Sequence, residues 1–426
     1  MDIVVPKVIN ERKFLCPKSN HKNFLSVYAH KLSDQKTHAM KNSILAIFFG
    51  LLFFSCQPIV LPEPITASFE KTYGEGGIDY AMAGTILNDY IYLIGTSNGR
   101  QPISGGLLLV KIDQMGKELF QRSYGGNISD GGGNIISTSD GNLLLLGRTR
   151  VAVNSTTTQD DIFLLKVTPD GDTLWTRTYG DLLAFDTAKG LIETDDGGIL
   201  LLGGAYNGSL RDFRAIRLDA QGNEIWRKVY TSPYDDNGVD IARAGNDHYL
   251  LFGRRQAGDD DFYTIKINGQ GDSIWTASYG TPYYEEGHSI YKTQDNGFIL
   301  CGHSSGVDPL HNLYLVKIDA DGKLMFEKNY GGAMHDGGTD AVELDNGDFL
   351  LVGETDSHGN GSKRGFFVHT DSSGNIVEER SYGGDLSDKF SAILLTNSAH
   401  YLIGESASFS QDTKADCYVV KRKNNE

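Results

Sequence analysis

Residues 286–330 read EGHSIYKTQDNGFILCGHSSGVDPLHNLYLVKIDADGKLMFEKNY. Four short apolar runs alternate with Gly-containing turns and loops, and the unit closes on a tyrosine. Tyrosines in the same setting recur every 49 to 55 residues, at Tyr73, Tyr124, Tyr179, Tyr230, Tyr279, Tyr330 and Tyr382. A period near fifty residues, built of short strands and tight turns, is typical of β-propeller blades. The sequence therefore predicts an all-β repeat fold.

The two ends of the repeat region predict the number of blades. After Tyr382 only three apolar strands follow, at 390–395, 401–404 and 418–421, while one isolated strand, Phe69–Tyr73, precedes the first complete unit. If this strand completes the last blade, both free edges disappear. We predict a seven-bladed β-propeller of four-stranded antiparallel blades over 69–421, with 3+1 closure by the N-terminal strand and a tail at 422–426.

Outer strands carry a second pattern around most of these tyrosines, with Glu378 and Ala277 as its exceptions. An aromatic residue stands four positions before it and a basic residue two positions before it, as in Trp175, Arg177 and Tyr179. Period two places all three on one strand face. We interpret the pattern as packing between blades, with the basic stems lying over the aromatic rings.

An export signal precedes the propeller. Ile44–Phe54 is an apolar run behind Lys41, and it is too short for a membrane-spanning helix of about 20 residues. Phe53-Phe54-Ser55-Cys56 resembles a bacterial lipobox, which implies cleavage before Cys56 and acylation of its sulfur. An ordinary signal peptide or an uncleaved anchor is the alternative. We predict a lipoprotein signal peptide at 40–55 and a Pro-rich tether at 56–68.

Residues 1–39 do not look like a signal, so we interpret them as a non-native extension and Met40 as the true start. Gln57 follows the lipobox cysteine, where many inner-membrane lipoproteins have Asp. We therefore predict an outer-membrane lipoprotein of a Gram-negative bacterium, periplasmic or surface-exposed. Its lipid anchor is the predicted membrane contact.

Turns and outer strands of several repeats resemble the tryptophan-docking motif of quinoprotein-type propellers, as in Asp219-Ala-Gln-Gly222 followed by Trp226. The whole unit is similar to bacterial secreted and lipoprotein β-propeller repeat proteins over 69–421. That resemblance implies extracellular or periplasmic binding, not one reaction. The chain lacks the adjacent cysteines of quinoprotein dehydrogenases, so no quinone cofactor is expected. Cys301 and Cys417 are predicted to be buried thiols without a disulfide.

The net negative charge of the chain restricts the classes of ligand that it can bind. The formal net charge is −16, and residues 56–426 hold 31 basic against 52 acidic side chains. Such a chain is a poor general binder of nucleic acid, whose phosphates require Lys and Arg surfaces. We expect no nucleic acid, a glycan or protein ligand and a monomer. Simple solubility is the alternative explanation of the acidity.

Long and dissimilar loops between the second and third strands should share one end of the ring with the blade-to-blade connections, and variable loops on a rigid scaffold carry specificity. Blades five and six interrupt the repeat there with tyrosines and histidines, and blades two and four add basic side chains. His303 and His311 lie in the loop of blade five. The candidate binding residues are Tyr283, Tyr284, Glu286, His288, His303, His335, Arg148, Arg254 and Arg255.

We call the seven recurring tyrosines the anchor tyrosines. An acidic residue follows each of them by six or seven positions, and together these acidic residues should circle the mouth of the ring: Asp79, Asp130, Asp186, Asp236, Glu286, Asp336 and Asp388. Crowded carboxylates attract a hard cation, so Ca²⁺ is possible here. The alternative is that each carboxylate accepts N–H bonds within its own loop.

The sequence favours a membrane-anchored, non-catalytic module that binds a glycan, peptide or protein through the face with long loops. The alternative is a glycan-degrading enzyme, a lyase or hydrolase, with a site at the mouth of blades five and six. Such a site would bring His288, His335 and a tyrosine together in one pocket.

Overall fold

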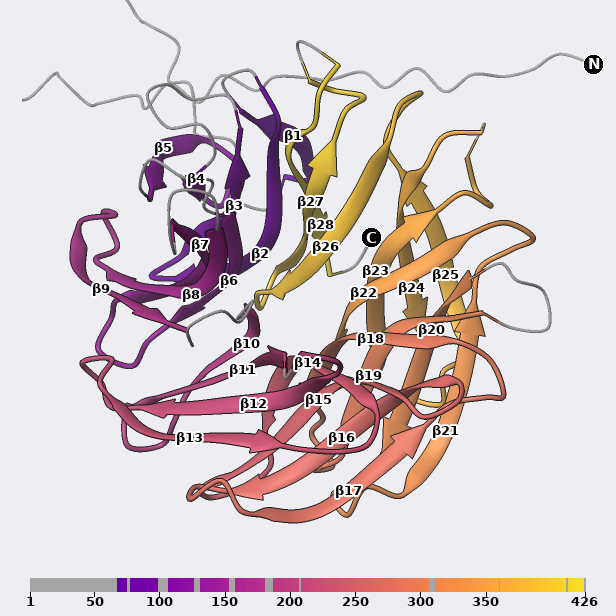
Figure 1. The fold of residues 1–426 in the computed structure, drawn as a ribbon. Helices are drawn as coiled ribbons and strands as arrows, with labels where there is room; N and C mark the ends of the chain where they lie inside the picture. Colours follow the sequence, from indigo (N-terminus) through magenta and orange to yellow (C-terminus); the bar gives the residue numbers. More distant parts are fainter. Residues whose placement is uncertain are drawn as a thin grey trace, which may run out of the picture. The chain divides into compact units, whose positions relative to one another are not determined.

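The computed structural model describes residues 67–424, except 75–76, 99–105, 126–130, 153–157, 181–186, 207, 306–310, 360 and 411–412. Every regular element in this part is a β-strand, and the strands form seven four-stranded antiparallel sheets arranged in a ring (Figure 1). Strand β2 of the first blade contacts β26, β27 and β28 of the last, which closes the ring. The predicted seven-bladed propeller is confirmed.

Blades one to six run from the innermost to the outermost strand in chain order, and blade seven takes β1 as its outermost strand. The first four blades are β2 (Asp79–Leu87), β3 (Tyr90–Ser97), β4 (Gly106–Ile112), β5 (Glu118–Tyr124); β6 (Gly131–Ser137), β7 (Leu143–Ala152), β8 (Thr158–Val167), β9 (Thr173–Tyr179); β10 (Thr187–Glu193), β11 (Ile199–Tyr206), β12 (Arg211–Leu218), β13 (Glu224–Tyr230); and β14 (Asp235–Arg243), β15 (His248–Gln256), β16 (Asp260–Asn268), β17 (Ser273–Tyr279). The last three are β18 (Glu285–Lys292), β19 (Phe298–Ser305), β20 (His311–Ile318), β21 (Leu324–Tyr330); β22 (Asp336–Glu343), β23 (Phe349–Thr355), β24 (Arg364–Thr370), β25 (Ile376–Tyr382); and β26 (Asp388–Leu395), β27 (Ala399–Ser406), β28 (Asp416–Lys423), β1 (Phe69–Tyr73).

Blade seven is shared by the two ends of the propeller. Strand β1 pairs antiparallel with β28, with Phe69 opposite Lys421 and Tyr73 opposite Cys417. The order of this sheet is β1-β28-β27-β26, in agreement with the predicted 3+1 closure. Cys301 and Cys417 are both buried and free.

The anchor tyrosines fasten each blade to the next. The Tyr179 hydroxyl donates a hydrogen bond of 2.6 Å to the carbonyl of Gly222, in the turn before the outer strand of the following blade. Gly222 has φ +78°, a conformation that costs a residue with a Cβ about 1–2 kcal/mol. Equivalent bonds to turn glycines are made by Tyr73, Tyr124, Tyr230, Tyr279 and Tyr330.

Tyr382 is the exception among the seven, because its buried hydroxyl has no partner within the described residues. Its neighbour is blade seven, where the outer strand arrives from the other end of the chain. No turn connects β28 to β1, so the glycine carbonyl that the other tyrosines use does not exist there. The missing bond is a consequence of how the ring closes.

The outer strands pack as their sequence pattern predicts. The Arg177 guanidinium lies 5.6 Å from the centre of the half-buried Trp175 ring. Lys228 lies over Trp226 and Arg122 over Phe120 in the same way. In these blades the cation–π contacts cover the aromatic edge of the outer strand.

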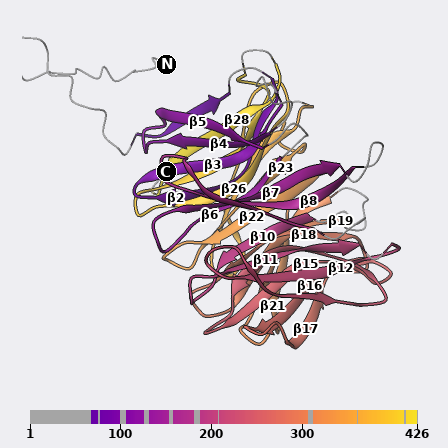
Figure 2. The ribbon, with the colours of Figure 1, turned by 60° about the vertical axis from the view of Figure 1, so that its left-hand side comes forward.

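The two ends of the ring differ, as the loops predict. We call the end with the blade-to-blade and second-to-third connections the loop face, and the opposite end the turn face (Figure 2). Tight turns close the turn face, such as Thr138–Asn142 and Asp319–Lys323. Residues 1–39, the predicted signal peptide at 40–55 and all but the last residues of the tether lie outside the described part. Within it, no helix has the length and apolar character needed to cross a bilayer.

Candidate active site

The candidate site begins where the two inner strands of blade five meet the loop face, at a β-bulge that all seven blades share. Strands β18 and β19 pair so that Glu285 lies opposite Ser304 and Glu286 opposite His303. A β-bulge between Gly287 and Ser289 leaves His288 without a ladder partner. A bulge re-aims the side chain of its extra residue. Here it brings His288 Nε2 within 3.3 Å of His303 Nδ1.

Four imidazoles form a row from this point toward blade six. The ring centres of His288 and His303 are 5.2 Å apart, those of His303 and His311 are 4.7 Å apart, and those of His311 and His335 are 4.8 Å apart. His311 begins β20, and His335 belongs to the connection that leads into β22. The row therefore crosses the boundary between two blades. We call it the histidine row.

Tyr284 stands beside this row and is fixed at both its backbone and its ring. Its N–H donates to Ser305 Oγ at 3.1 Å, and its carbonyl accepts from Ser305 N–H at 2.8 Å. The phenol donates to Glu286 Oε2 at 2.6 Å. The ring stacks on His303 at 5.9 Å between centres and meets His311 edge-on.

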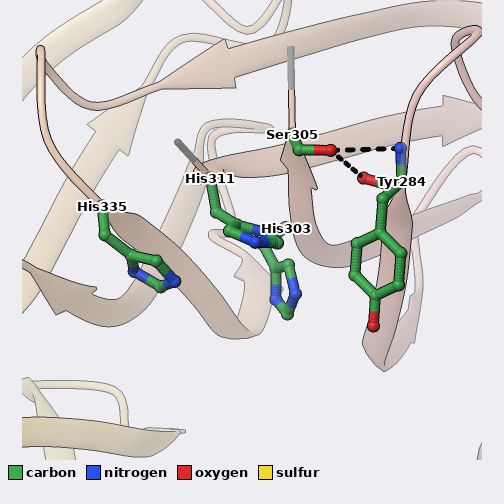
Figure 3. A pocket seen from close by; sticks show the side chains of 5 residues that line it. All are labelled: Tyr284, His303, Ser305, His311 and His335. Carbon is green, nitrogen blue, oxygen red and sulfur yellow. Dashed lines mark hydrogen bonds between the residues drawn. The ribbon is translucent and has the colours of Figure 1, made fainter. Parts of the chain in front are cut away.

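These side chains line one pocket of about 440 Å³, formed by Tyr284, His303, Ser305, His311 and His335 (Figure 3). A volume of this size suits one or a few sugar units or another small ligand. The Nδ1 atoms of His311 and His335 are buried and have no hydrogen-bond partner within the described residues.

Burial determines the protonation of the row. It lowers the pKa of His288 to about 4 and, with His288 as a further cause, that of His303 to about 3. Burial and the neighbouring His335 also lower the pKa of His311. The three imidazoles are therefore neutral at neutral pH and can accept a proton.

Tyr284 and Glu286 share a hydrogen bond that shifts the pKa of both side chains. Burial, and then the bond to Glu286, raise the pKa of Tyr284 to about 12, so its phenol keeps the proton. Burial acts to raise the pKa of Glu286, but the hydrogen bond from Tyr284 and the favourable charges nearby, Arg254 among them, together outweigh burial, so the pKa lies below its usual value. A proton donor and neutral proton acceptors thus face the same pocket.

The structure separates the predicted binding residues into groups. Tyr284, His303 and His335 line the pocket, while Glu286 and His288 lie directly behind it, hydrogen-bonded to Tyr284 and His303 respectively. Tyr283 is exposed next to the pocket. The structure adds Ser305 and His311, of which only His311 carried a sequence signal, as a histidine in a loop that breaks the repeat.

The predicted arginines are already paired. Arg148 bonds to Asp160 at 3.1 Å within blade two, and it is not brought to the pocket. Arg255 is held by Asp236 at 2.7 Å and stacks on a tyrosine of its own blade. Arg254 bonds to Asp260 at 3.1 Å in blade four, the blade next to the pocket.

The described aspartates of the predicted acidic ring are buried, rather than forming an open set of charges. Asp336 accepts from Gly332 N–H and Ser357 Oγ, each at 2.7 Å, and Asp388 makes the equivalent bonds to Gly384 and Ser408. Asp79 and Asp236 are also buried. This arrangement is the local hydrogen bonding that the sequence left open as an alternative.

In blade five the ring position belongs to Glu285, which is buried and bonds to Thr281 and Ser304, and not to Glu286. The shift by one residue frees Glu286 for Tyr284. Asp130 and Asp186 lie outside the described residues. In the described part of the chain, no three His, Cys, Asp or Glu side chains are placed to hold a metal ion, so the possible Ca²⁺ has no ligand set there.

Comparison with known proteins relates the chain to others by fold. No family model and no curated protein matches it. Among solved structures it is similar to a puromycin hydrolase (12 % identity, TM-score 0.53, covering 82 % of this chain and 52 % of that one) and to an ulvan lyase, a polysaccharide lyase (10 %, 0.54, 83 % and 97 %). A Fusarium graminearum α-L-arabinofuranosidase is also similar (12 %, 0.46, 68 % and 92 %). The chain spans about half the length of the puromycin hydrolase.

The prediction that the chain is not an enzyme is corrected here. Both of these neighbours with a TM-score above 0.5 are enzymes, although identities of 10 % and 12 % show the fold alone. In addition, His303, His311 and His335 line one pocket with Tyr284. By fold, the chain is a seven-bladed β-propeller whose structural neighbours include enzymes.

Proposed function

We propose that this chain is a polysaccharide lyase, which cleaves a uronate-containing glycan by β-elimination at the histidine row. The observation that carries the proposal is the pocket itself: a tyrosine that keeps its proton and neutral histidines that can accept one. Elimination needs these two roles and no cofactor. The ulvan lyase of the same fold is compatible with this proposal but does not establish it.

His303 is the proposed base and Tyr284 the proposed acid. The base removes the proton from the carbon next to the uronate carboxylate, and that electron pair forms the new C=C bond as the glycosidic C–O bond breaks. The leaving oxygen keeps its bonding pair and takes the proton of Tyr284. The imidazolium then releases its proton to solvent, and Tyr284 regains one. No atom is oxidised or reduced overall.

The low pKa of the free histidines is compatible with this role. A bound uronate places a negative charge beside His303, which favours the charged imidazolium and raises its pKa toward the working range. Glu286 holds the Tyr284 hydroxyl at 2.6 Å until substrate arrives. The substrate carboxylate thus has two functions, since it acidifies the carbon to be deprotonated and strengthens the base.

Hydrolysis is less well supported than elimination. Most glycoside hydrolases place two carboxyl groups about 5–9.5 Å apart across the scissile bond. Among the residues that the structure describes, the side chains that line this pocket include no carboxylate. Of the two nearest, Glu286 accepts the Tyr284 phenol, and Glu285 is buried among Thr281 and Ser304.

His303→Gln is expected to lower kcat for polysaccharide cleavage about 10²–10⁴-fold, because a general base is lost while the volume of the side chain is nearly kept. The assay follows the ultraviolet absorbance of the conjugated unsaturated uronate on polygalacturonate, alginate, hyaluronan and ulvan. His248→Gln, at the start of β15 on the turn face, is the matched control. Equal rates for the two variants on every cleaved polymer would contradict the assignment.

We also propose that Cys56 carries a lipid anchor at the outer membrane. The support is the lipobox-like sequence and its position thirteen residues before β1. Cys56→Ala is expected to move the protein from the membrane to the soluble fraction of a Gram-negative host, with the fatty-acid mass absent from its N-terminal peptide. An unchanged distribution would contradict the anchor.

A further inference from the structure

We infer that Tyr283, Tyr234 and Tyr206 form a row of sugar-stacking platforms, which guides a polysaccharide chain from the pocket across blades four and three. We call this row the tyrosine track. The inference rests on the proposed function in so far as the bound polymer is the substrate of the histidine row. It adds a binding surface outside the pocket and a preference for long chains.

The three tyrosines are among the more exposed large side chains of the loop face. Tyr283 is 37 % exposed, Tyr234 39 % and Tyr206 46 %. Tyr283 and Tyr234 belong to the connections that lead into blades five and four, and Tyr206 ends the second strand of blade three. Three consecutive blades therefore each present one tyrosine at the same end of the ring.

A set of ion pairs connects Arg254, which lies near Tyr284 of the pocket, with the segments that carry Tyr234 and Tyr206. Arg254 lies close enough to Tyr284 to lower the pKa of its phenol against the larger effect of burial. From there Arg254 pairs with Asp260 at 3.1 Å and approaches Asp235 at 3.6 Å. Asp235 is the neighbour of Tyr234 in sequence, so the set leads from the pocket to the second platform.

The same set continues to the third platform. The Asp235 carboxylate accepts two hydrogen bonds from the Arg211 guanidinium, at 2.8 Å and 3.1 Å, and one from the backbone N–H of Arg211 at 2.8 Å. Arg211 is the cross-strand partner of Tyr206 in the β11–β12 ladder. Tyr234 and Tyr206 thus flank one ion pair.

This combination has the chemistry of a carbohydrate site. The apolar C–H faces of a sugar ring suit the face of a tyrosine, which gives a rigid contact at low entropy cost. Sugar hydroxyls need fixed donors and acceptors, which Arg211, Arg254 and Asp235 supply. The chemical class of the ligand is a polysaccharide chain several residues long.

The platforms are supported before any ligand arrives. The Arg255 guanidinium lies 5.5 Å from the Tyr234 ring, and Arg255 is itself held by Asp236 at 2.7 Å. The Tyr206 hydroxyl bonds to the Gly208 carbonyl at 3.1 Å. Single exposed apolar residues need no explanation in a soluble protein. Three exposed tyrosines on adjacent blades, linked to a pocket by ion pairs, do need an explanation.

The test measures retardation of the full chain in native gels that contain polygalacturonate, alginate, hyaluronan or ulvan. Tyr234→Ala and Tyr206→Ala are each expected to weaken binding to the retarding polymer about tenfold, which corresponds to about 1.4 kcal/mol. Tyr234→Phe keeps the ring and should bind as the parent does. Tyr90→Ala is the matched control, because Tyr90 is equally exposed at 37 % but lies at the turn face.

The outcomes separate this inference from the proposed function. Retardation that depends on Tyr234 and Tyr206, in a chain that cleaves no polymer, supports the track and overturns the lyase. Cleavage with an unchanged KM in Tyr234→Ala and Tyr206→Ala supports the lyase and overturns the track. The track is also overturned if no polymer retards the chain, or if Tyr234→Phe binds as weakly as Tyr234→Ala.

Discussion

Tyr284→Phe is expected to lower the rate of polysaccharide cleavage about 10²–10⁴-fold without disturbing the fold. The phenol lines the pocket, and its raised pKa, about 12, keeps it protonated well above neutral pH. Phenylalanine retains the ring that stacks on His303 at 5.9 Å. The loss should therefore appear in kcat more than in KM, measured by initial rates on the cleaved polymer.

Tyr90→Phe supplies the control for this variant. Tyr90 is exposed at the turn face and belongs to neither the pocket nor the tyrosine track. A thermal midpoint of Tyr284→Phe equal to that of the parent would show that this variant is folded. If the folded Tyr284→Phe protein cleaves at the parental rate, Tyr284 is not the acid and the proposed chemistry is wrong.

Removal of strand β1 is expected to give the largest loss of stability. A chain that starts at residue 75 loses all five pairs with β28, the packing of Phe69 and the Tyr73 bond to Gly116. Loss of a single large buried aromatic side chain costs about 3–5 kcal/mol, so the total should exceed that. The measurement is the free energy of unfolding from urea denaturation.

The control keeps β1 and starts at residue 67, which removes only residues outside the described part. It should unfold as the full propeller does, whereas the chain that starts at residue 75 should also associate through the exposed edge of β28. Light scattering or gel filtration detects this association. Equal unfolding free energies for the two truncations would show that β1 does not close the ring.

Much of the fold could be predicted from the sequence because it depends on local repeats. Each unit carries its own turns, apolar strands and closing tyrosine, so the number of units and the orphan strand Phe69–Tyr73 determine the ring. Even the exception confirms this logic, since Tyr382 lacks a partner where the closure removes a turn. The glycine carbonyls that accept the other tyrosines were not predicted, because they lie in the next blade.

The site was only partly predictable, because it depends on contacts between blades and loops. The repeat irregularity at Tyr283 to His288 pointed to the sector where the structure places the pocket. Spacing alone could not show that His311 and His335 would meet across a blade boundary at 4.8 Å. It also could not show which of Glu285 and Glu286 would be buried, since a shift by one residue in a loop exchanges their roles.

The most direct test of the account is the structure of the product. The full chain is incubated with polygalacturonate, alginate, hyaluronan and ulvan, and the fragments are analysed by ultraviolet absorbance and mass spectrometry. The account predicts that at least one polymer yields fragments with an unsaturated uronate at the new end, each one water lighter than its hydrolysis product. Fragments with saturated ends, or intact polymers throughout, would contradict it.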